Sequence, residues 1–353
     1  MFEYPELAES RLALETQDEI FKPSSFWENA SAEIVEELYR EGIEKFRSLP
    51  LPLSFFAPTY GSPGGGFSQE QVKGLKNWLL ENHPNAKKPQ LGLGLFLDGL
   101  TQALSDYRVL KASDDIRSLP ELHQFSESKE GDPIEHFEFE GRWFSRSSLN
   151  YLLGLAFLKK HLNGDVPRVV LEIGGGFGSL GEVLASSNIE GLKYIDVDIP
   201  PTSYIAQYYL SQVLGEENVS SYHKTKDLKI IKIEDLPQAS VFCSWQIEML
   251  QGSVDLFVNF ISFQEMEPTI VQNYCNHVSR LNAKWVLLRN MREGKQIKTN
   301  ENPVGVKTPI KSDDYNSMLP NYELVDSSII PYGYETVDEF NSELLLFKRK
   351  AKT

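Results

Sequence analysis

The chain has 353 residues, 41% of them hydrophobic, and carries 35 Lys and Arg against 50 Asp and Glu, a formal net charge of −15. At roughly 100–200 residues per domain, this length predicts two domains or one large α/β domain with an extension, and the apolar content excludes disorder as the main state. Because an acidic chain repels phosphate backbones, we expect no nucleic-acid partner.

The sequence pattern predicts a cytoplasmic protein. No apolar run approaches the roughly 20 residues of a membrane-spanning helix. Glu3 stands where a signal peptide would carry a positive charge. The two cysteines, Cys243 and Cys275, have no metal-like spacing. We therefore expect no membrane span, no disulfide and no metal site.

Residues 1–144 read as helical segments interrupted by Pro and Gly clusters. Ser25 and Glu28 have the spacing of a capping box and predict the start of a surface helix. The string FFAPTYGSPGGGF at 55–67 predicts a loop, either a lid over a substrate or a plain connector. A helix is expected at 68–82, and alternation over 134–144 predicts a β-hairpin.

From residue 145 to 353, continuous apolar runs alternate with amphipathic segments, which is typical of a parallel sheet covered by helices on both faces. The run at 241–244 is the expected third strand, although 228–233 competes for that place. Strands are predicted at 168–173, 192–197, 254–260 and 285–289, helices at 145–161, 179–187, 202–214 and 267–280, and a closing antiparallel pair at 322–330 and 343–348. The expected fold is a doubly wound, Rossmann-like α/β sheet with a mainly helical N-terminal extension.

The segment VVLEIGGGFG, residues 169–178, carries the strongest functional signal, because a buried strand runs into a glycine-rich turn that opens a helix. In a doubly wound sheet, ligands bind at the carboxyl ends of the strands beside such a turn. Glycines let the backbone approach a ligand without an intervening Cβ, and the helix start offers free N–H groups.

Two ligand classes fit this turn. Gly176, Gly178 and Gly181 match the dinucleotide pattern G-x-G-x-x-G. The alternative pattern is acidic-x-G-x-G-x-G, in which Glu172 ends the apolar strand, Gly174 follows at the turn, and the carboxylate can meet an ammonium group. The second pattern is favoured, because a dinucleotide turn does not need that charge and its first glycine would lie past the strand end.

A second acid supports an adenosine site without separating the two classes. Asp198 ends the next predicted strand, 24 positions after Gly174, near the roughly 20 expected for a ribose-binding carboxylate. The candidate cofactor-binding residues around the motif and the strand ends are Glu172, Gly174, Gly175, Gly176, Gly178, Asp198, Ile199, Trp245, Gln246 and Asn259.

The acidic-x-G-x-G-x-G run resembles motif I of class I S-adenosylmethionine-dependent methyltransferases. Residues 140–290 further resemble the sugar O-methyltransferases associated with surface-polysaccharide gene clusters, through LEIGGGFG, through Asp198-Ile-Pro-Pro and through the string NFISFQEM at 259–266. The resemblance implies S-adenosylmethionine as cofactor and a hydroxyl of a glycan or nucleotide-sugar as acceptor. It also implies that Arg146, Asn150 and Tyr151 reach the methionine end of the cofactor. The N-terminal extension, 1–144, is then expected to shape the acceptor site in front of the cofactor domain, 145–353.

Transfer to a hydroxyl requires an acceptor oxygen in line with the methyl group and a base for its proton. Glu265, after the strand at 254–260, is the candidate base, although an acid there also suits the start of a helix. His277 is the alternative, in the body of a helix where packing is its ordinary role. Arg289, Asn290 and Tyr60 are candidate substrate residues.

Two other functions stay open on the sequence: an NAD(P)-dependent sugar oxidoreductase, and a non-catalytic subunit that keeps the fold and binds a partner chain. A possible metal set, His136, Glu138 and Glu140, shares one face of the predicted hairpin. Alternation with two phenylalanines explains those three as the solvent face of a strand.

Overall fold

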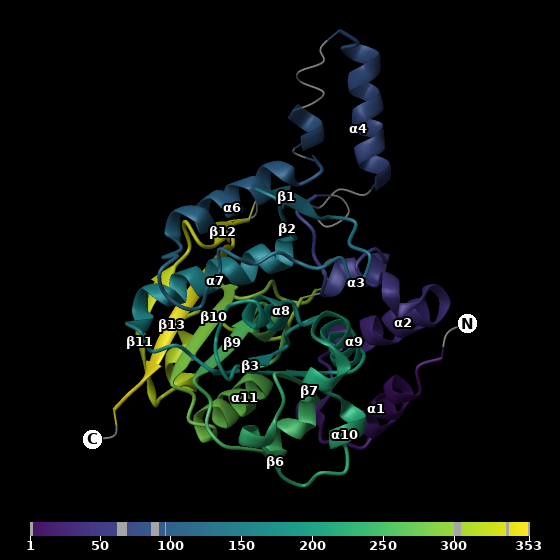
Figure 1. Cartoon of the computed structure of the whole chain (residues 1–353). Helices are drawn as coiled ribbons and strands as arrows, with labels where there is room; N and C mark the ends of the chain where they lie inside the picture. Colours follow the sequence, from purple (N-terminus) through teal and green to yellow (C-terminus); the bar gives the residue numbers. More distant parts are fainter. Residues whose placement is uncertain are drawn as a thin grey trace.

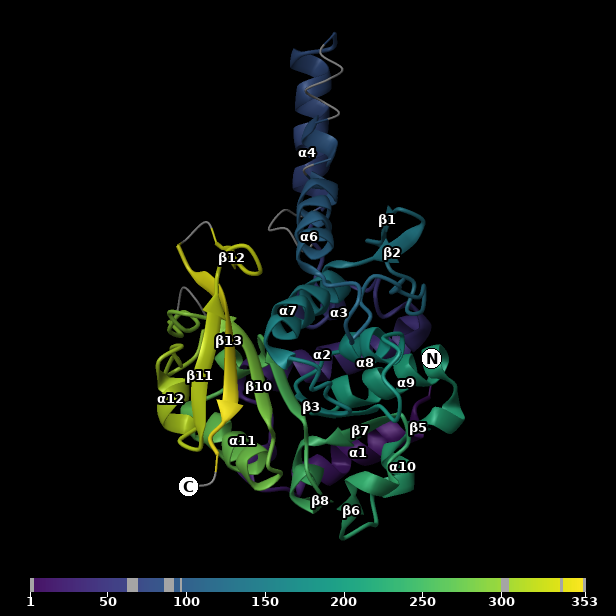
Figure 2. The same cartoon turned by 60° about the vertical axis from the view of Figure 1, so that its left-hand side comes forward.

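The structure is a computed structural model that describes residues 3–61, 69–85, 92–95, 97–299, 305–336 and 339–351. Its centre is a mostly parallel sheet with helices on both faces (Figures 1 and 2). The glycine-rich stretch of the loop expected at 55–67 lies outside the described residues.

The main sheet confirms the doubly wound fold. Its strand order is β11 (Tyr322–Ser328), β13 (Asn341–Arg349), β10 (Trp285–Met291), β9 (Leu256–Phe260), β3 (Val169–Ile173), β4 (Lys193–Asp198), β7 (Ala239–Cys243) and β5 (Val219–Ser220), and β12 (Tyr334–Glu335) pairs with β13. In this spatial order, the six strands from β10 through β9, β3, β4 and β7 to β5 run parallel. Strand β13 runs antiparallel to both of its neighbours, β10 and β11. The strand order reverses direction at β3, and ligands bind at such switch points.

The competition for the third strand is resolved in favour of the later segment. Strand β7 occupies the place beside β4. The earlier segment contributes only β6 (Ile231–Lys232), which pairs with β8 (Leu250–Gln251) outside the main sheet.

Two apolar clusters lie on the two faces of the sheet. Alternate strand residues point to opposite faces, so Val170 and Val258 join one cluster while Leu171 and Phe257 join the other. The first face is covered by α7 (Arg146–Leu162), α8 (Ser179–Ala185) and α9 (Thr202–Leu214), and the second by α11 (Pro268–Arg280) and α12 (Asp314–Met318). Burial on both faces explains why the central strands β3, β7, β9 and β10 are mainly apolar.

The remaining short elements connect these layers. They are α10 (Tyr222–Thr225) and the 3₁₀ turns η1 (Glu19–Phe21), η2 (Ile43–Lys45), η3 (Glu216–Asn218), η4 (Ile233–Asp235), η5 (Ser244–Met249) and η6 (Ser262–Glu265). No helix in the described part of the chain is long and apolar enough to cross a bilayer.

The N-terminal part is mainly helical, as expected. It contains α1 (Pro5–Glu15), α2 (Ser25–Glu41), α3 (Pro50–Phe55), α4 (Gln69–Asn82), α6 (Leu100–Ser113) and the predicted hairpin of β1 (Phe137–Phe139) and β2 (Arg142–Phe144). Helix α4 projects from the body (Figures 1 and 2). The capping box expected at Ser25 is wrong: Ser24 is the N-cap residue and makes no side-chain cap hydrogen bond.

The two parts of the chain share one core. Ile34, Leu38 and Phe46 pack in the same apolar cluster as Leu152 and Tyr209. The ring of Phe46 lies 5.9 Å from that of Tyr209, centroid to centroid. The position of α2 relative to the sheet domain is therefore fixed by buried contacts.

Candidate functional site

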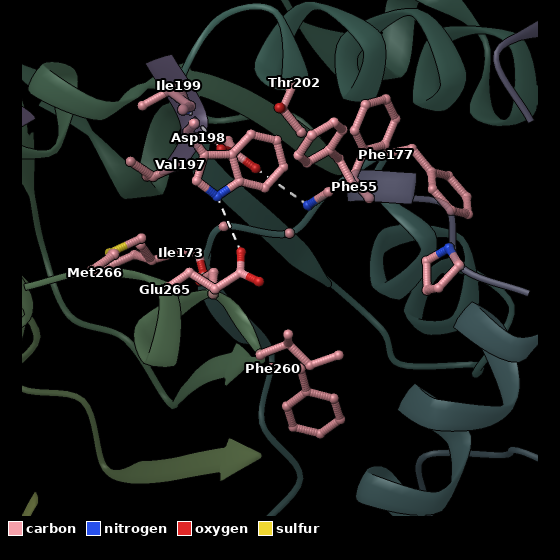
Figure 3. Close-up of a pocket in the computed structure, with 18 of the residues that line it drawn as sticks. Phe55, Ile173, Phe177, Val197, Asp198, Ile199, Thr202, Phe260, Glu265 and Met266 are labelled. Atoms are coloured by element: carbon pink, nitrogen blue, oxygen red, sulfur yellow. Dashed lines mark hydrogen bonds between the residues drawn. The ribbon is translucent and has the colours of Figure 1, made fainter. Parts of the chain in front are cut away.

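A cavity opens at the carboxyl ends of β3, β4 and β9 (Figure 3), and with its open mouth it encloses about 1170 Å³. Of the residues singled out from sequence, Tyr151, Gly174, Gly175, Gly176, Asp198, Ile199 and Glu265 line it. The wall also includes residues from the N-terminal part, among them Ser24, Trp27, Phe55 and Phe56.

The glycine turn needs its glycines. Gly174 and Gly176 have φ of 70° and 63°, in the region that L side chains rarely adopt. A Cβ on Gly175 would lie 2.6 Å from Oδ1 of Asp196 and 2.8 Å from Oε2 of Glu172. Gly178 does not line the cavity and instead is the N-cap residue of α8, with φ of 88°. The turn therefore packs directly on two carboxylates.

Asp198 reaches the cavity from the end of β4. Its Oδ1 accepts a hydrogen bond from the Ile199 N–H at 2.7 Å, and its Oδ2 accepts one from the Gly176 N–H at 3.2 Å. Burial nevertheless raises the pKa of Asp198 to about 7, because desolvation disfavours the charged carboxylate and the nearby charge of Glu265 repels it. In its charged form this carboxylate can accept hydrogen bonds from hydroxyl groups or bind a cation.

Glu172, expected to meet the ammonium group of the ligand, lies buried beneath the turn and does not line the cavity wall. It pairs in register with Asp196 across β3 and β4, and both side chains are fully buried. Glu172 Oε2 accepts a hydrogen bond from the Tyr194 hydroxyl at 2.6 Å. One oxygen of each carboxyl group has no hydrogen-bond partner among the described residues.

Burial favours the protonated forms of Glu172 and Asp196. It raises the pKa of Glu172 to about 7 and raises that of Asp196 well above its usual range. Sequence reasoning missed Asp196, although the alternation of acids in IDVD at 195–198 marks two of them on one face of β4.

Glu265 lies in the cavity (Figure 3) but is not free. Its Oε1 forms an ion pair with Nζ of Lys295 at 2.9 Å, and its Oε2 accepts a hydrogen bond from Nε1 of Trp27 at 3.1 Å. The hydroxyl of Ser24 donates to its backbone carbonyl at 3.1 Å. Glu265 therefore joins the N-terminal part to the cavity floor.

One part of the cavity wall is apolar. Ile199, as expected, contributes to it, and the other members, absent from the sequence predictions, are Val197, Met266, Ile270 and Tyr274. Figure 3 shows Val197, Ile199 and Met266 along one side of the cavity. Another part of the wall holds Tyr151, whose ring stacks on that of Phe260 with centroids 5.0 Å apart.

Trp245, Gln246 and Asn259 lie outside the cavity wall. The Trp245 ring packs at 6.1 Å from that of Tyr222. Gln246 Oε1 accepts a hydrogen bond from the Cys243 N–H at 2.9 Å, because η5 turns both side chains back into the core. Asn259 is buried behind the turn and donates to the Ile173 carbonyl at 2.8 Å.

The remaining candidates also lie off the cavity wall. His277 on α11 accepts a hydrogen bond from Arg280 at 3.2 Å, and burial lowers its pKa to about 4. Arg289 and Asn290 are buried, and Asn290 Oδ1 accepts a bond from the Gln264 N–H at 3.1 Å. The hydroxyl of Tyr60 donates to Asp106.

Of the three residues expected on the solvent face of the hairpin, Glu138 and Glu140 are exposed, whereas the His136 side chain is largely buried. His136 lies 3.4 Å from Glu127, and Glu140 accepts hydrogen bonds from Tyr107 and Lys111. No group of His, Cys, Asp or Glu within the described ranges is arranged to hold a metal ion.

No family model matches the chain, and no curated protein matches it either. Among solved structures, it is similar to magnesium protoporphyrin IX methyltransferase from Synechocystis PCC 6803 with bound SAH, at 16% identity and a TM-score of 0.36 over 56% of this chain and 80% of that one. The mitomycin 7-O-methyltransferase MmcR aligns at 10% identity and a TM-score of 0.37 over 95% and 76%.

The N-terminal domain of EvdMO1, in the presence of SAH and D-fucose, aligns at 12% identity and a TM-score of 0.36 over 62% of this chain and 91% of that one. Likenesses this distant carry no functional argument. The case for a function therefore rests on the cavity and its residues.

Proposed function

We propose that the protein is an S-adenosylmethionine-dependent O-methyltransferase that acts on a sugar hydroxyl of a glycan or nucleotide-sugar. One observation supports it above the others: Asp198 lines the cavity edge, and Glu172 and Asp196 lie directly beneath the glycine turn. Carboxylates attract the sulfonium and ammonium groups of this cofactor and repel the pyrophosphate of a dinucleotide. The buried pair of Glu172 and Asp196 therefore disfavours the NAD(P)-dependent oxidoreductase, whereas Asp198 suits the ribose of either cofactor.

The cavity offers a partner for each portion of this cofactor. The carboxylate of Asp198 would accept hydrogen bonds from the ribose hydroxyls, and Ile199 with the apolar wall would pack on the adenine. The backbone of Gly174–Gly176 and the side chain of Tyr151 would hold the methionine portion, and the buried acids beneath the turn would attract its ammonium group.

When bound, the cofactor supplies an activated methyl group on sulfur. The chain must hold the acceptor oxygen in line, exclude water and receive the acceptor proton. Glu265 is the proposed proton acceptor, and its two hydrogen-bonding partners fix its orientation in the cavity. Trp27 and Phe55, with ring centroids 5.4 Å apart, help to close the cavity to water.

The sugar acceptor is proposed on the sequence resemblance, and the cytoplasmic location stays a prediction. Residues 1–144 are proposed as the acceptor-side cap because their side chains form part of the cavity wall. A non-catalytic protein of the same fold would not need a cavity with carboxylates at the glycine turn. This feature therefore disfavours a non-catalytic subunit.

Calorimetry with S-adenosylhomocysteine and with NADH tests the proposal. We expect heat with the first ligand and none with the second, and loss of the heat in Asp198→Ala but not in Asp227→Ala, a change at an exposed position. Binding of NADH alone, or of neither ligand, would contradict it. Glu265→Gln should then lower turnover of labelled methyl groups while keeping the cofactor affinity, and an unchanged rate would remove Glu265 as the base.

A further inference from the structure

A second part of the cavity wall is not used in the cofactor assignment above, although the sequence resemblance implies that two of its residues reach the methionine end. It is formed by Arg146 and Asn150 on the first two turns of α7 and by Tyr334 on β12. All three side chains are partly exposed, so a ligand in the cavity has access to them. This part of the wall is called the arginine wall below.

Arg146 is held by neighbouring groups without forming an ion pair in the described part of the chain, although its charge acts on the carboxyl groups of Glu135 and Asp106. Its Nη1 donates to the Thr59 carbonyl at 3.0 Å, and its guanidinium carbon lies 5.7 Å from the ring centroid of Tyr60 and 6.0 Å from that of Tyr334. No carboxylate among the described residues lies within ion-pair distance of it. One of its five N–H donors is used in the described structure, and the others remain for a ligand.

A supporting layer behind the arginine wall keeps it in place. Tyr60, one of the two rings beside Arg146, donates its hydroxyl to Asp106. Arg289, 2% exposed, donates to Asn150 Oδ1 and to the Tyr332 carbonyl. The nearby acid Glu135 accepts a bond from the Gly61 N–H at 2.8 Å.

We propose that the arginine wall is the acceptor subsite and that it selects a sugar bearing an anionic group, a phosphate or a carboxylate, which Arg146 binds. Asn150 is placed to meet a sugar hydroxyl, and Tyr60, Asp106 and Arg289 are positioning residues. This inference rests on the proposed function, since it names the acceptor of that methyl transfer.

The chemistry of the two parts of the cavity supports this assignment. The planar guanidinium fork matches a carboxylate or phosphate through two parallel hydrogen bonds. In a chain with a formal charge of −15, an anionic acceptor needs a local cation to bind. The carboxylates near Asp198 repel the same anion, so the charge pattern sets which end of the acceptor points away from the cofactor.

The test uses named probes in the presence of S-adenosylhomocysteine. Saturation-transfer NMR compares neutral hexoses of the gluco, galacto and manno series with their 1-phosphates, their uronic acids and the matching nucleoside-diphosphate sugars. Radiolabelled methyl transfer is measured with the same panel. Comparison of the sugar 1-phosphates with the uronic acids shows whether Arg146 prefers a phosphate or a carboxylate.

We expect an anionic probe to bind about 10- to 100-fold more tightly than its neutral hexose, as charged hydrogen bonds allow. Arg146→Gln should abolish that preference and leave the affinity for S-adenosylhomocysteine unchanged. Arg146→Lys should recover only part of it, because a point charge cannot bind two oxygens in the same way. Arg117→Gln, at an exposed arginine away from the cavity, is the matched control and should change nothing.

Three results would overturn the inference while leaving the proposed function standing. The first is equal binding of neutral and anionic probes, and the second is binding of none of the probes at millimolar concentration. The third is loss of S-adenosylhomocysteine affinity in Arg146→Gln, which would assign the arginine to the cofactor's own carboxylate. Failure of wild-type protein to bind S-adenosylhomocysteine would instead refute the proposed function itself.

Discussion

The affinity for S-adenosylhomocysteine is expected to rise with pH because of Asp198. Burial raises the pKa of this carboxyl to about 7 in the empty cavity. The ammonium group and ribose hydroxyls of a bound ligand favour the charged carboxylate, so a proton must leave before the ligand binds well. The affinity therefore falls as the pH drops below that pKa and levels off above it.

The magnitude follows from the ionised fraction. With a pKa of about 7, about one carboxyl in ten is charged at pH 6, so the dissociation constant at about pH 6 should be roughly tenfold larger than at about pH 8. Glu172, whose pKa burial also raises to about 7, makes the dependence steeper if it too must ionise.

Calorimetry at several pH values, in buffers of different ionisation enthalpy, measures both the affinity and the protons released. Asp198→Asn should bind weakly and lose most of the pH dependence, whereas Asp227→Asn should follow the wild-type curve. A flat wild-type profile between about pH 6 and 8, or tighter binding at the acidic end, would refute the reasoning. An unchanged slope in Asp198→Asn would assign the titration to another group.

Three further predictions concern other parts of the fold. Gly175→Ala should weaken S-adenosylhomocysteine binding by more than about tenfold, because the added Cβ would clash with two buried carboxylates. The control, Gly74→Ala, adds a methyl group in open space on α4 and should leave the affinity unchanged. Equal affinities of the Gly175→Ala variant and the wild type would show that the turn can shift to accommodate the methyl group. Arg47→Met should destabilise the protein by about 3–5 kcal/mol in urea unfolding, because it removes the guanidinium 2.9 Å from the buried carboxylate of Glu127 and leaves that charge with only the His136 ring and the Ser145 hydroxyl. A loss below about 1 kcal/mol would show that the pair contributes no more than an exposed one. His277→Gln should leave methyl transfer unchanged, since the neutral ring lies off the cavity wall, and a large loss of turnover would restore it as a candidate base.

The order of strands and helices was readable from the sequence because its causes are local. Apolar runs separated by amphipathic segments specify a sheet buried on both faces. The turn at 174–176 could be placed because a strand cannot continue through three glycines. Asp198 could also be identified from local sequence, because an acid at the end of an apolar strand differs from its neighbours.

The rest of the site was decided by contacts between residues far apart in the chain. Trp27 and Glu265 are 238 residues apart, and nothing near either one indicates that they meet. Trp245 follows a strand end as Asp198 does, but η5 turns it into the core. Local periodicity and turn chemistry determine which segments form strands and which ends can hold a ligand. Which side chains close around that ligand depends on how the helices pack over the sheet, and that packing is settled by the whole buried core at once.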